Sequence, residues 1–329
     1  MAKVVRTDRE LEVPAVDAAL RAAGHELVLL PDGVSEEVLV RETQQAVLVL
    51  MCYTPITRRV IESANQLKGI VKYGVGIDAI DIAAARSRGI PVVNVPEYAE
   101  ETVAEGAFAL MIALAKNLKR LERAMSRDGW AWPEQRWLAS DLAGKTVGLV
   151  GLGRIGSSFA RMAAGFRMRV ASYDPYVPAA THKDLQAMLA ESDFVSIHCV
   201  LSDETRHLIG ERELRAMKPT AFLINVSRGA IVDEAALLKV LVEKKIAGAG
   251  LDVYAREPLA KTGHPLSALY AMDNVILSPH LTFHTREAMA RLEADTLARC
   301  REVLEGRPVT VRSRDPRLRA QTRGVRFAD

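Results

Sequence analysis

The sequence predicts an α/β protein built from two doubly wound parallel sheets, and two observations support this prediction. Segments typical of strands alternate with segments typical of helices in the first hundred residues, and the alternation resumes after residue 146. Such alternation is the pattern of a parallel sheet with helices on both faces. The length of 329 residues exceeds one ordinary domain. We therefore expect two α/β domains in one chain.

In the N-terminal part, apolar runs between turn residues predict strands, and amphipathic spacing predicts helices. The expected strands are Lys3–Arg6, Glu26–Leu30, Ala46–Met51, Gly69–Lys72 and Pro91–Val95. The expected helices are Val13–Ala23, Thr57–Ala64 and Ile82–Arg88. These segments form a complete small α/β unit.

The next part opens with one long helix, predicted over Thr102–Met125 from Ala, Leu and Met at helical spacing. The further strands are expected at Val147–Val150, Met168–Tyr173, Phe194–His198, Ala221–Val226, Gly248–Val253 and Val275–Leu277. The further helices are expected at Ser157–Gly165, Glu211–Met217, Glu234–Lys244 and Thr285–Glu305. Together these patterns predict a second α/β unit inserted into the first.

All three tryptophans fall between Gly129 and Trp137, where Pro133 interrupts any helix. Two interpretations stay open. The segment is either a loop that covers a local apolar patch or a contact between two copies of the chain, since aromatic residues concentrate at interfaces.

Composition and charge argue against several classes of function. The net charge is only +3, and no Lys/Arg stripe is interleaved with aromatic residues, so we expect no nucleic-acid partner. The sequence has neither a bilayer-spanning segment nor a secretory signal pattern, so we expect no membrane partner and a cytoplasmic location. The cysteines Cys52, Cys199 and Cys300 fit neither a disulfide framework nor a zinc spacing, and no metal is expected.

An arginine-rich tail runs from Val311 to Arg326. We expect it to be a solvated and poorly ordered terminus. Binding of an acidic partner is the alternative interpretation.

The stretch Val147–Gly156 carries the most informative local signal. An apolar strand leads into Gly151, Gly153 and Gly156 at G-x-G-x-x-G spacing, followed by an amphipathic helix and a second strand. In such a turn the first glycine allows a tight bend, the second allows close approach of a pyrophosphate, and the third lets the helix pack on the strand. The helix N-terminus adds unpaired N–H donors. We therefore predict a dinucleotide site, with a plain strand-to-helix connector as the alternative for the glycines alone.

Asp174 at the end of the second strand determines the expected cofactor. It lies about twenty residues beyond the last glycine, where a carboxylate accepts hydrogen bonds from ribose hydroxyls. The same carboxylate would repel a 2′-phosphate, so NAD is favoured over NADP.

Three chemically useful side chains, Arg228, Glu257 and His280, follow predicted strands. Ligands of open α/β sheets bind at the carboxyl ends of strands. Taken singly, each residue also fits a structural role, as a surface ion pair, a loop acid or a hydrogen-bonded histidine. Together they supply a guanidinium that holds a carboxylate, an imidazole that transfers a proton near neutral pH, and a carboxylate that favours the imidazolium. This set fits hydride exchange at a carbon that bears a carboxylate.

In their order these motifs resemble the D-isomer-specific 2-hydroxyacid dehydrogenases, a family that includes phosphoglycerate dehydrogenases and the C-terminal-binding-protein corepressors. The resemblance runs from about Ala46 to Pro308. It implies two Rossmann-like domains and usually a homodimer. The NAD-binding domain would comprise residues 101–283, inserted into a flavodoxin-like substrate domain of residues 1–100 and 284–329.

Residue by residue, the resemblance implies that Arg228 binds substrate and polarises its carbonyl, that Glu257 pairs with the histidine, and that His280 is the acid/base. It also implies that the backbone of Val75 and Gly76 grips the substrate carboxylate. The implied cofactor contacts, besides the glycines and Asp174, are Thr102, Arg154, Ile155, Cys199, Thr205, Val226, Ser227 and Asp252. Cys199 is interpreted as a small apolar filler and not as a nucleophile.

Some positions depart from the family pattern. Many members carry small residues after the histidine, whereas Phe283 stands here near the place of a corepressor-branch tryptophan, and we expect it to wall the substrate pocket. Two residues after His198, Val200 replaces the proline that is usual in the family. In this respect the sequence is closer to the corepressor branch. Tyr53 is expected either to contact substrate or to pack locally. The cations Lys72, Arg58 and Arg59 either bind a phosphate or belong to an ordinary surface.

The sequence thus predicts an NAD-dependent oxidoreductase that interconverts a D-2-hydroxy acid and its 2-oxo acid. The alternative is an NAD(H)-sensing, corepressor-like binding protein with vestigial catalysis. A formate- or phosphite-type relative fits less well, because its substrate needs a smaller pocket than Tyr53 and Phe283 predict.

Overall fold

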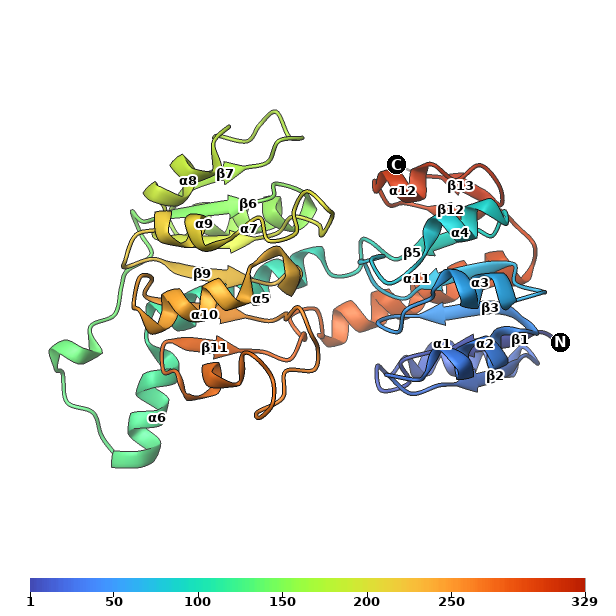
Figure 1. Ribbon diagram of the computed structural model, residues 1–329, viewed down its shortest axis with the longest axis horizontal. Helices are drawn as coiled ribbons and strands as arrows, with labels where there is room; N and C mark the ends of the chain where they lie inside the picture. Colours follow the sequence, from blue (N-terminus) through green and yellow to red (C-terminus); the bar gives the residue numbers. More distant parts are fainter. Residues whose placement is uncertain (329) are drawn as a thin grey trace. The chain divides into compact units, whose positions relative to one another are not determined.

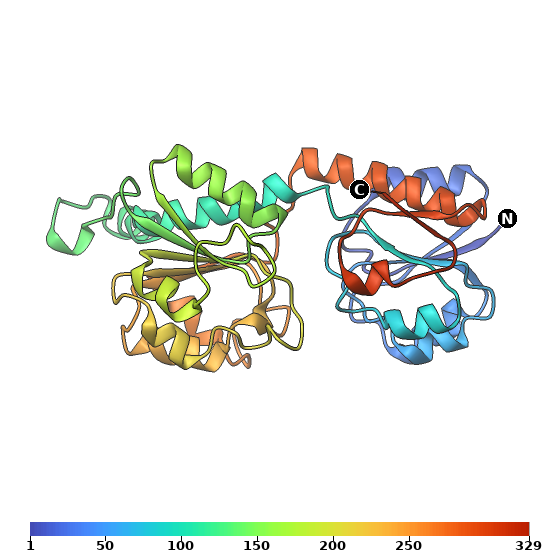
Figure 2. The same ribbon diagram turned by 90° about the horizontal axis from the view of Figure 1, so that it is seen from above.

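The computed structural model describes residues 1–328 and divides the chain into two compact units. Unit 1 comprises Met1–Ala99 and the chain from Thr285 onward, and unit 2 comprises Glu100–His284. Each unit is built around one large parallel sheet with helices on both faces (Figures 1 and 2), which confirms the predicted fold class. Within residues 1–328, none of the helices has the length and apolar character needed to cross a bilayer.

The sheet of unit 1 has five parallel strands in the order β2-β1-β3-β4-β5. The strands are β1 (Lys3–Arg6), β2 (Glu26–Leu29), β3 (Ala46–Met51), β4 (Gly69–Lys72) and β5 (Val92–Asn94). The helices are α1 (Pro14–Ala22), α2 (Glu36–Thr43), α3 (Arg58–Ser63), α4 (Ile82–Ser87) and α11 (Arg286–Leu304). β3 and β4 are almost entirely buried, as parallel strands covered by helices on both faces require.

Helix α2 is absent from the sequence-based prediction. It begins after Ser35, whose hydroxyl accepts a hydrogen bond from Val38 N at 3.4 Å, and two acidic residues follow in its first turn. A serine cap followed by acids is a recognised helix start, so the sequence did contain the signal for α2.

The expectation of a poorly ordered arginine-rich tail is wrong. The segment forms β12 (Val309–Val311), α12 (Pro316–Arg319) and β13 (Val325–Phe327), and β12 pairs with β13 in parallel. The buried side chain of Gln321 accepts from Val92 N at 2.7 Å and donates to Val92 O at 2.9 Å. Arg326 pairs with the buried Glu302 at 3.1 Å. Specific partners in unit 1 therefore order a segment whose composition alone is typical of a flexible terminus.

The sheet of unit 2 has six parallel strands in the order β11-β10-β9-β8-β6-β7. The strands are β6 (Thr146–Val150), β7 (Arg169–Tyr173), β8 (Phe194–Ile197), β9 (Phe222–Asn225), β10 (Gly248–Leu251) and β11 (Val275–Leu277). Figure 2 shows α5 (Glu100–Ala115) and α7 (Arg154–Gly165) on one face, and on the other α8 (Leu185–Glu191), α9 (Glu211–Ala216) and α10 (Glu234–Val242). The connections change direction between β6 and β8, which is where ligands of such sheets bind.

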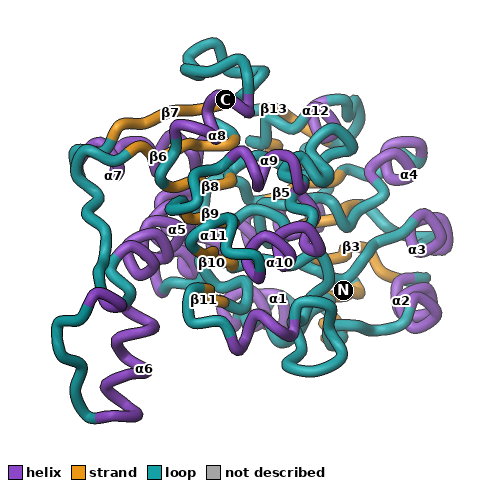
Figure 3. Tube along the Cα trace, turned by 60° about the vertical axis from the view of Figure 1, so that its left-hand side comes forward, coloured by secondary structure: helices purple, strands orange, loops and turns teal. Residues whose placement is uncertain are grey.

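The single helix predicted over Thr102–Met125 is in fact two helices, α5 and α6 (Leu118–Asp128). Asn117 separates them with a φ of 54°, and its side-chain amide donates to Leu138 O at 2.8 Å. Asparagine adopts this left-handed conformation more readily than most residues. The apolar spacing continues across the break, so periodicity alone did not reveal it. In Figure 3, α6 projects from unit 2.

Candidate active site

The glycine turn joins β6 to α7. Gly151 has a φ of 97°, and a Cβ there would lie 2.5 Å from Cys199 N, so both its conformation and its surroundings require glycine. A Cβ at Gly156 would lie 2.3 Å from Gly151 O, because α7 packs closely on the turn. A Cβ at Gly153 would meet no atom of the described chain within 4 Å. The chain therefore packs tightly against the turn at Gly151 and Gly156 and leaves open space at Gly153. This open space fits a pyrophosphate at the N-terminus of α7.

Asp174 follows β7 directly and lies beside this turn. Its Oδ2 accepts from Leu152 N at 2.8 Å, and its Oδ1 accepts from Tyr176 N at 3.0 Å. Each carboxylate oxygen has a further lone pair. Asp174 is therefore held beside the glycine turn with acceptor capacity to spare, and the residues around the turn fit a bound NAD.

Apart from Asp252, which follows β10, the other predicted cofactor positions lie on α5, on α7 and on the loops after β8 and β9. Ser227 Oγ donates to Cys199 O at 2.5 Å and so joins those two loops, while Thr205 Oγ1 donates to Val200 O at 2.7 Å. Burial raises the pKa of the Cys199 thiol to about 12, which makes this group a poor nucleophile. The remaining positions are the buried Thr102 and Val226, and Arg154 and Ile155 in the first turn of α7.

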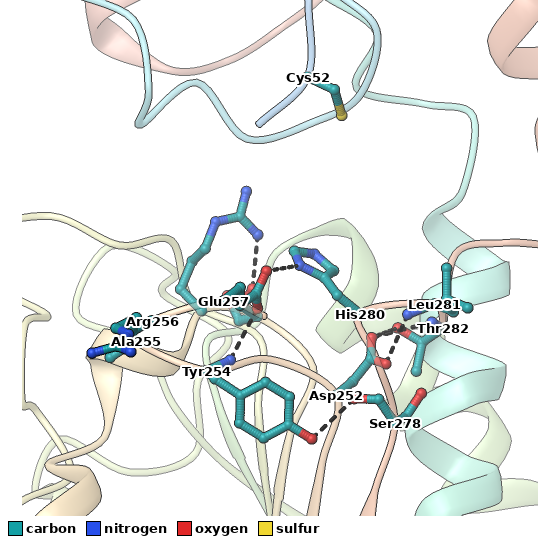
Figure 4. A network of polar contacts seen from close by, with 12 residues as sticks. Cys52, Asp252, Tyr254, Ala255, Arg256, Glu257, Ser278, His280, Leu281 and Thr282 are labelled. Atoms are coloured by element: carbon teal, nitrogen blue, oxygen red, sulfur yellow. Dashed lines mark hydrogen bonds and ion pairs between the residues drawn. The ribbon is translucent and has the colours of Figure 1, made fainter. Parts of the chain in front are cut away.

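His280 and Glu257 form a direct pair at the carboxyl ends of β11 and β10. Nδ1 of His280 lies 2.8 Å from Oε2 of Glu257, and the two side chains face each other in Figure 4. Oε1 of Glu257 accepts from Tyr254 N at 3.0 Å, which fixes the orientation of the carboxylate. The side chains of His280 and Glu257 remain 23% and 32% exposed. A carboxylate on Nδ1 orients the ring and leaves Nε2 for proton transfer.

Asp252 holds the backbone that carries His280. Its fully buried carboxylate accepts from Leu281 N at 2.9 Å, from Thr282 N at 3.1 Å and from Thr282 Oγ1 at 2.6 Å (Figure 4). His280 has a φ of 59°, a left-handed conformation that is strained for most residues. The hydrogen bonds that Asp252 accepts from Leu281 and Thr282, the two residues after His280, compensate for this strain. Asp252, which the resemblance assigns to the cofactor, thus also positions the histidine.

Arg228 lies on the loop after β9, beside the loop that carries Glu257. A Cβ at Gly229 would lie 2.0 Å from Tyr254 C and 2.1 Å from Ala255 N, so the two loops are in backbone contact. Asn225 Nδ2 donates to Arg228 O at 3.0 Å, and Arg228 Nη1 donates to Ser227 O at 2.7 Å. The ends of β9, β10 and β11 therefore bring Arg228, Glu257 and His280 to one edge of one sheet.

Sequence reasoning missed two residues of this site, Tyr254 and Thr282. The Tyr254 hydroxyl donates to Ser278 O at 3.0 Å and so ties the loop after β10 to the loop before His280. Burial raises the pKa of Tyr254, which keeps this donor protonated. Thr282 and its partner Asp252 are 30 residues apart. No local pattern joins residues at that distance, so only the fold could reveal the contact.

Phe283 is buried with its ring 6.3 Å from the His280 ring in an edge-on arrangement. The predicted wall residue therefore adjoins the imidazole. Among the residues that the structure describes, no group of three or more His, Cys, Asp or Glu side chains is arranged to hold a metal ion.

The predicted substrate residues of unit 1 follow β3 and β4. Tyr53 is 37% exposed, and Lys72 Nζ lies 5.3 Å from the centre of its ring. The loop with Val75 and Gly76 is fixed by the buried Asn94, whose Nδ2 donates to Val75 O at 2.6 Å. These residues belong to unit 1, whereas the histidine pair belongs to unit 2.

The glycine turn, Asp174 and the His280–Glu257 pair define a class of protein, the dinucleotide-dependent oxidoreductases with Rossmann-like domains. Residues 108–282 match the family model described as "D-isomer specific 2-hydroxyacid dehydrogenase, NAD binding domain". A glyoxylate reductase of Korarchaeum cryptofilum is 41% identical over 276 residues, which cover 80% of this chain and 82% of the relative. The chain belongs to the D-isomer-specific 2-hydroxyacid dehydrogenase family.

Two further relatives extend this comparison. A D-3-phosphoglycerate dehydrogenase of Synechocystis sp. is 36% identical over 94% of this chain, but the match covers only 55% of that relative. The structure of D-lactate dehydrogenase from Aquifex aeolicus, complexed with NAD and lactic acid, matches with a TM-score of 0.83 and 29% identity. That match covers 92% of this chain and 96% of the other.

These findings confirm the predicted activity. The protein is an NAD-dependent oxidoreductase that interconverts a D-2-hydroxy acid and its 2-oxo acid. The corepressor-like alternative finds no support among the relatives.

Proposed function

We propose that this enzyme reduces a short 2-oxo acid of the glyoxylate type with NADH, and that His280 is its acid/base. The single observation that carries the assignment of His280 is its 2.8 Å contact with Glu257 at the strand ends of the NAD-binding unit. When bound, NADH supplies a hydride to the carbonyl carbon. His280 donates a proton to the carbonyl oxygen, which completes the hydroxyl, and it accepts that proton in the reverse direction.

Glu257 supports the proton transfer by orienting the imidazole. A carboxylate next to Nδ1 holds the ring so that Nε2 can serve the reacting oxygen. Arg228 is proposed to bind the substrate carboxylate and to polarise the carbonyl, since a planar guanidinium can hold two oxygens at once. The backbone of Val75 and Gly76 is proposed to bind substrate. Tyr53 and Phe283 are also proposed to contact substrate.

The surroundings of the candidate phosphate-binding cations support an unphosphorylated substrate. Arg58 pairs with Glu62 at 3.4 Å, and Arg59 pairs with Glu36 at 3.0 Å. Lys72 is buried and donates to Cys52 O at 2.6 Å. Each of these three side chains already has a partner in unit 1. We therefore do not assign them to a phosphate.

The roles of the two units follow the same proposal. Unit 2 is proposed to bind NAD through its glycine turn and Asp174. Unit 1 is proposed to supply substrate contacts. Asp174 is proposed to exclude NADP because its carboxylate would repel a 2′-phosphate. We also propose a cytoplasmic location, as expected from the sequence.

A homodimer is also part of the proposal. Trp130 and Trp132 are 60% and 72% exposed on the segment that projects from unit 2 (Figure 3). This exposure favours the interpretation as a contact between copies over that of a loop covering a local patch, because large apolar groups exposed together mark interfaces. Sedimentation of the purified enzyme tests it.

The activity is tested by following NADH absorbance with glyoxylate, hydroxypyruvate, pyruvate, phenylpyruvate and a branched 2-oxo acid. We expect the highest kcat/KM with glyoxylate or hydroxypyruvate. Preference for phenylpyruvate or a branched acid would contradict the short-substrate proposal and leave the family activity intact. A strong preference for 3-phosphohydroxypyruvate over hydroxypyruvate would contradict the conclusion drawn from Arg58, Arg59 and Lys72.

A further inference from the structure

A second buried aspartate of this enzyme, Asp8, organises a loop in unit 1 much as Asp252 organises the loop after His280. Asp8 lies in the loop after β1, separated from the strand by Thr7, is only 1% exposed and has a φ of 56°. Aspartate tolerates this left-handed conformation better than most residues but still at some cost. A buried carboxylate in a strained backbone needs strong compensating contacts.

The carboxylate of Asp8 accepts hydrogen bonds from three consecutive backbone amides after β3. Oδ2 accepts from Cys52 N at 2.7 Å and from Tyr53 N at 3.0 Å, and Oδ1 accepts from Thr54 N at 2.9 Å. Two hydroxyls add to these, Thr54 Oγ1 at 2.6 Å and Thr7 Oγ1 at 2.5 Å. One side chain thus holds the whole Cys52–Thr54 loop.

The position of Asp8 is itself fixed from β1 and β4. The buried Tyr73 hydroxyl donates its one proton to Thr7 O at 2.6 Å, with Asp8 O at 3.2 Å as a second, weaker acceptor. Burial raises the pKa of Tyr73 well above its usual value, so the phenol remains a donor. Arg6 donates to Asp8 O at 3.4 Å and pairs with Asp17 at 2.9 Å. The loop therefore rests on a connected buried network and not on a single contact.

From this network we infer that Asp8 is a positioning residue of the enzyme: it holds the Cys52–Thr54 loop so that Tyr53 meets the substrate. The inference rests on the proposed contact between Tyr53 and substrate. Tyr53 is the exposed member of the loop, while Cys52 and Thr54 on either side are buried. Fixing the three amides therefore fixes the direction in which the Tyr53 ring leaves the backbone.

The chemistry of the contact requires a carboxylate. Both oxygens of an aspartate accept, whereas an asparagine replaces one oxygen by an NH2 group that would face N–H donors. Asp8→Asn keeps the shape of the side chain but places its NH2 group against the donors that one carboxylate oxygen binds in the native enzyme. The loop would then lose part of its hold while the strands beneath it keep their own hydrogen bonds.

The first experiment measures how reactive the Cys52 thiol becomes toward a thiol-reactive disulfide, with the modified peptide identified by mass spectrometry. Cys52 is 6% exposed and lies in the loop, and Cys300, fully buried in α11, is the internal control. We expect Asp8→Asn to accelerate modification of Cys52 by at least about tenfold and to leave Cys300 unchanged. Unchanged reactivity of Cys52 would overturn the inference. This readout needs no substrate, so it is independent of the proposed function.

The second experiment separates binding from catalysis, using glyoxylate and NADH. We expect Asp8→Asn to raise the KM for glyoxylate about tenfold, with kcat and the KM for NADH changed by less than about twofold. Asp193→Asn is the matched control, because Asp193 is a half-buried carboxylate of unit 2 that accepts from Thr146 N at 2.9 Å. It should lower stability without raising the KM for glyoxylate.

A double-mutant cycle tests whether Asp8 acts through Tyr53. In a Tyr53→Ala background, Asp8→Asn should raise the KM no further, because the group that it positions is gone. An equal rise in both backgrounds would overturn the inference and leave the Tyr53 contact standing. If Tyr53→Ala alone leaves the KM unchanged, the proposed substrate contact is wrong, and the positioning role falls with it.

A milder variant covers the case in which Asp8→Asn does not fold. Thr54→Val removes one hydroxyl donor to Asp8 and keeps the volume of the side chain. It should change the reactivity of Cys52 and the KM in the same direction, by about threefold. Wild-type values for both quantities would overturn the inference.

Discussion

Oε2 of Glu257 lies 2.8 Å from Nδ1 of His280, while Oε1 of the same carboxylate accepts from Tyr254 N at 3.0 Å. The two oxygens have separate tasks. One orients the imidazole, and the other anchors the carboxylate to its own loop. The pair is therefore held on both sides, as the proposed role of His280 as proton donor requires.

Glu257→Gln tests this division of tasks. Glutamine has one acceptor oxygen, so it can serve either His280 or Tyr254 N but not both. We expect kcat/KM for 2-oxo acid reduction to fall about 10- to 100-fold with the Kd for NADH unchanged. Steady-state kinetics and NADH fluorescence measure the two quantities. Glu243→Gln, which changes a surface partner of Arg215, is the control; a variant Glu257→Gln as active as that control would contradict the role of Glu257.

His280→Ala and Arg228→Ala test the proposed acid/base and substrate-binding residue. Each should lower kcat/KM by at least about 100-fold, because general acid–base catalysis alone contributes about 10²–10⁴. NAD binding should persist, since the glycine turn and Asp174 are untouched. Titration of NADH by fluorescence checks binding. Near-normal turnover by His280→Ala would remove this residue from the mechanism.

Asp174→Asn tests the basis of cofactor choice. The substitution removes the negative charge and keeps an acceptor for Leu152 N, which the native side chain binds at 2.8 Å. We expect weaker NAD binding and a rise of at least about tenfold in the ratio of kcat/KM for NADPH to that for NADH. An unchanged ratio would reject the ribose contact. Asp174→Ala should show the same shift with a further loss of stability in the turn.

His198 gives the enzyme a predictable sensitivity to acid. Its Nε2 lies 2.9 Å from Ser196 Oγ, and burial lowers the pKa of the ring from 6.5 to about 3. Above pH 6.5 neither the folded nor the unfolded chain carries this proton, so the free energy of unfolding does not depend on it. As the pH falls from 6.5 toward 3, the unfolded chain binds a proton that the folded chain refuses, and stability is lost.

The loss is at most about 1.4 kcal/mol per pH unit over that range. His198→Gln should therefore show a flatter decline of the free energy of unfolding between pH 6.5 and pH 5, measured by urea denaturation. The exposed His284→Gln serves as control and should keep the wild-type slope. Equal slopes in all three proteins would contradict the neutral state of the half-buried His198.

Gln321→Ala tests whether the C-terminal segment stabilises unit 1. The Gln321 amide satisfies both Val92 N and Val92 O at the free edge of β5. Its removal leaves two backbone groups without this partner, and we expect a loss of about 2–3 kcal/mol in the free energy of unfolding. Urea denaturation of Gln321→Ala against Gln66→Ala, which alters an exposed glutamine, makes the comparison. A loss no larger than in the control would contradict a stabilising role for the Gln321 contacts.

The sequence by itself determined the α/β class, the parallel sheets and the family, because these depend on local patterns. The apolar runs of β3 and β6 are continuous, and the glycines of the turn stand at fixed spacing around a tight bend. His280 and Glu257 were named as partners through the family resemblance, and the structure brings their side chains together.

Only the tertiary structure decided the break at Asn117, the ordered tail and the tasks of Asp8 and Asp252. Asn117 bonds to Leu138, Gln321 to Val92, Asp8 to Cys52–Thr54 and Asp252 to Thr282. Each contact joins residues far apart in the chain, where hydrophobic periodicity and turn signals carry no information. A buried carboxylate is stable only with donors around it, and which donors these are depends on how the strands are ordered in the sheet.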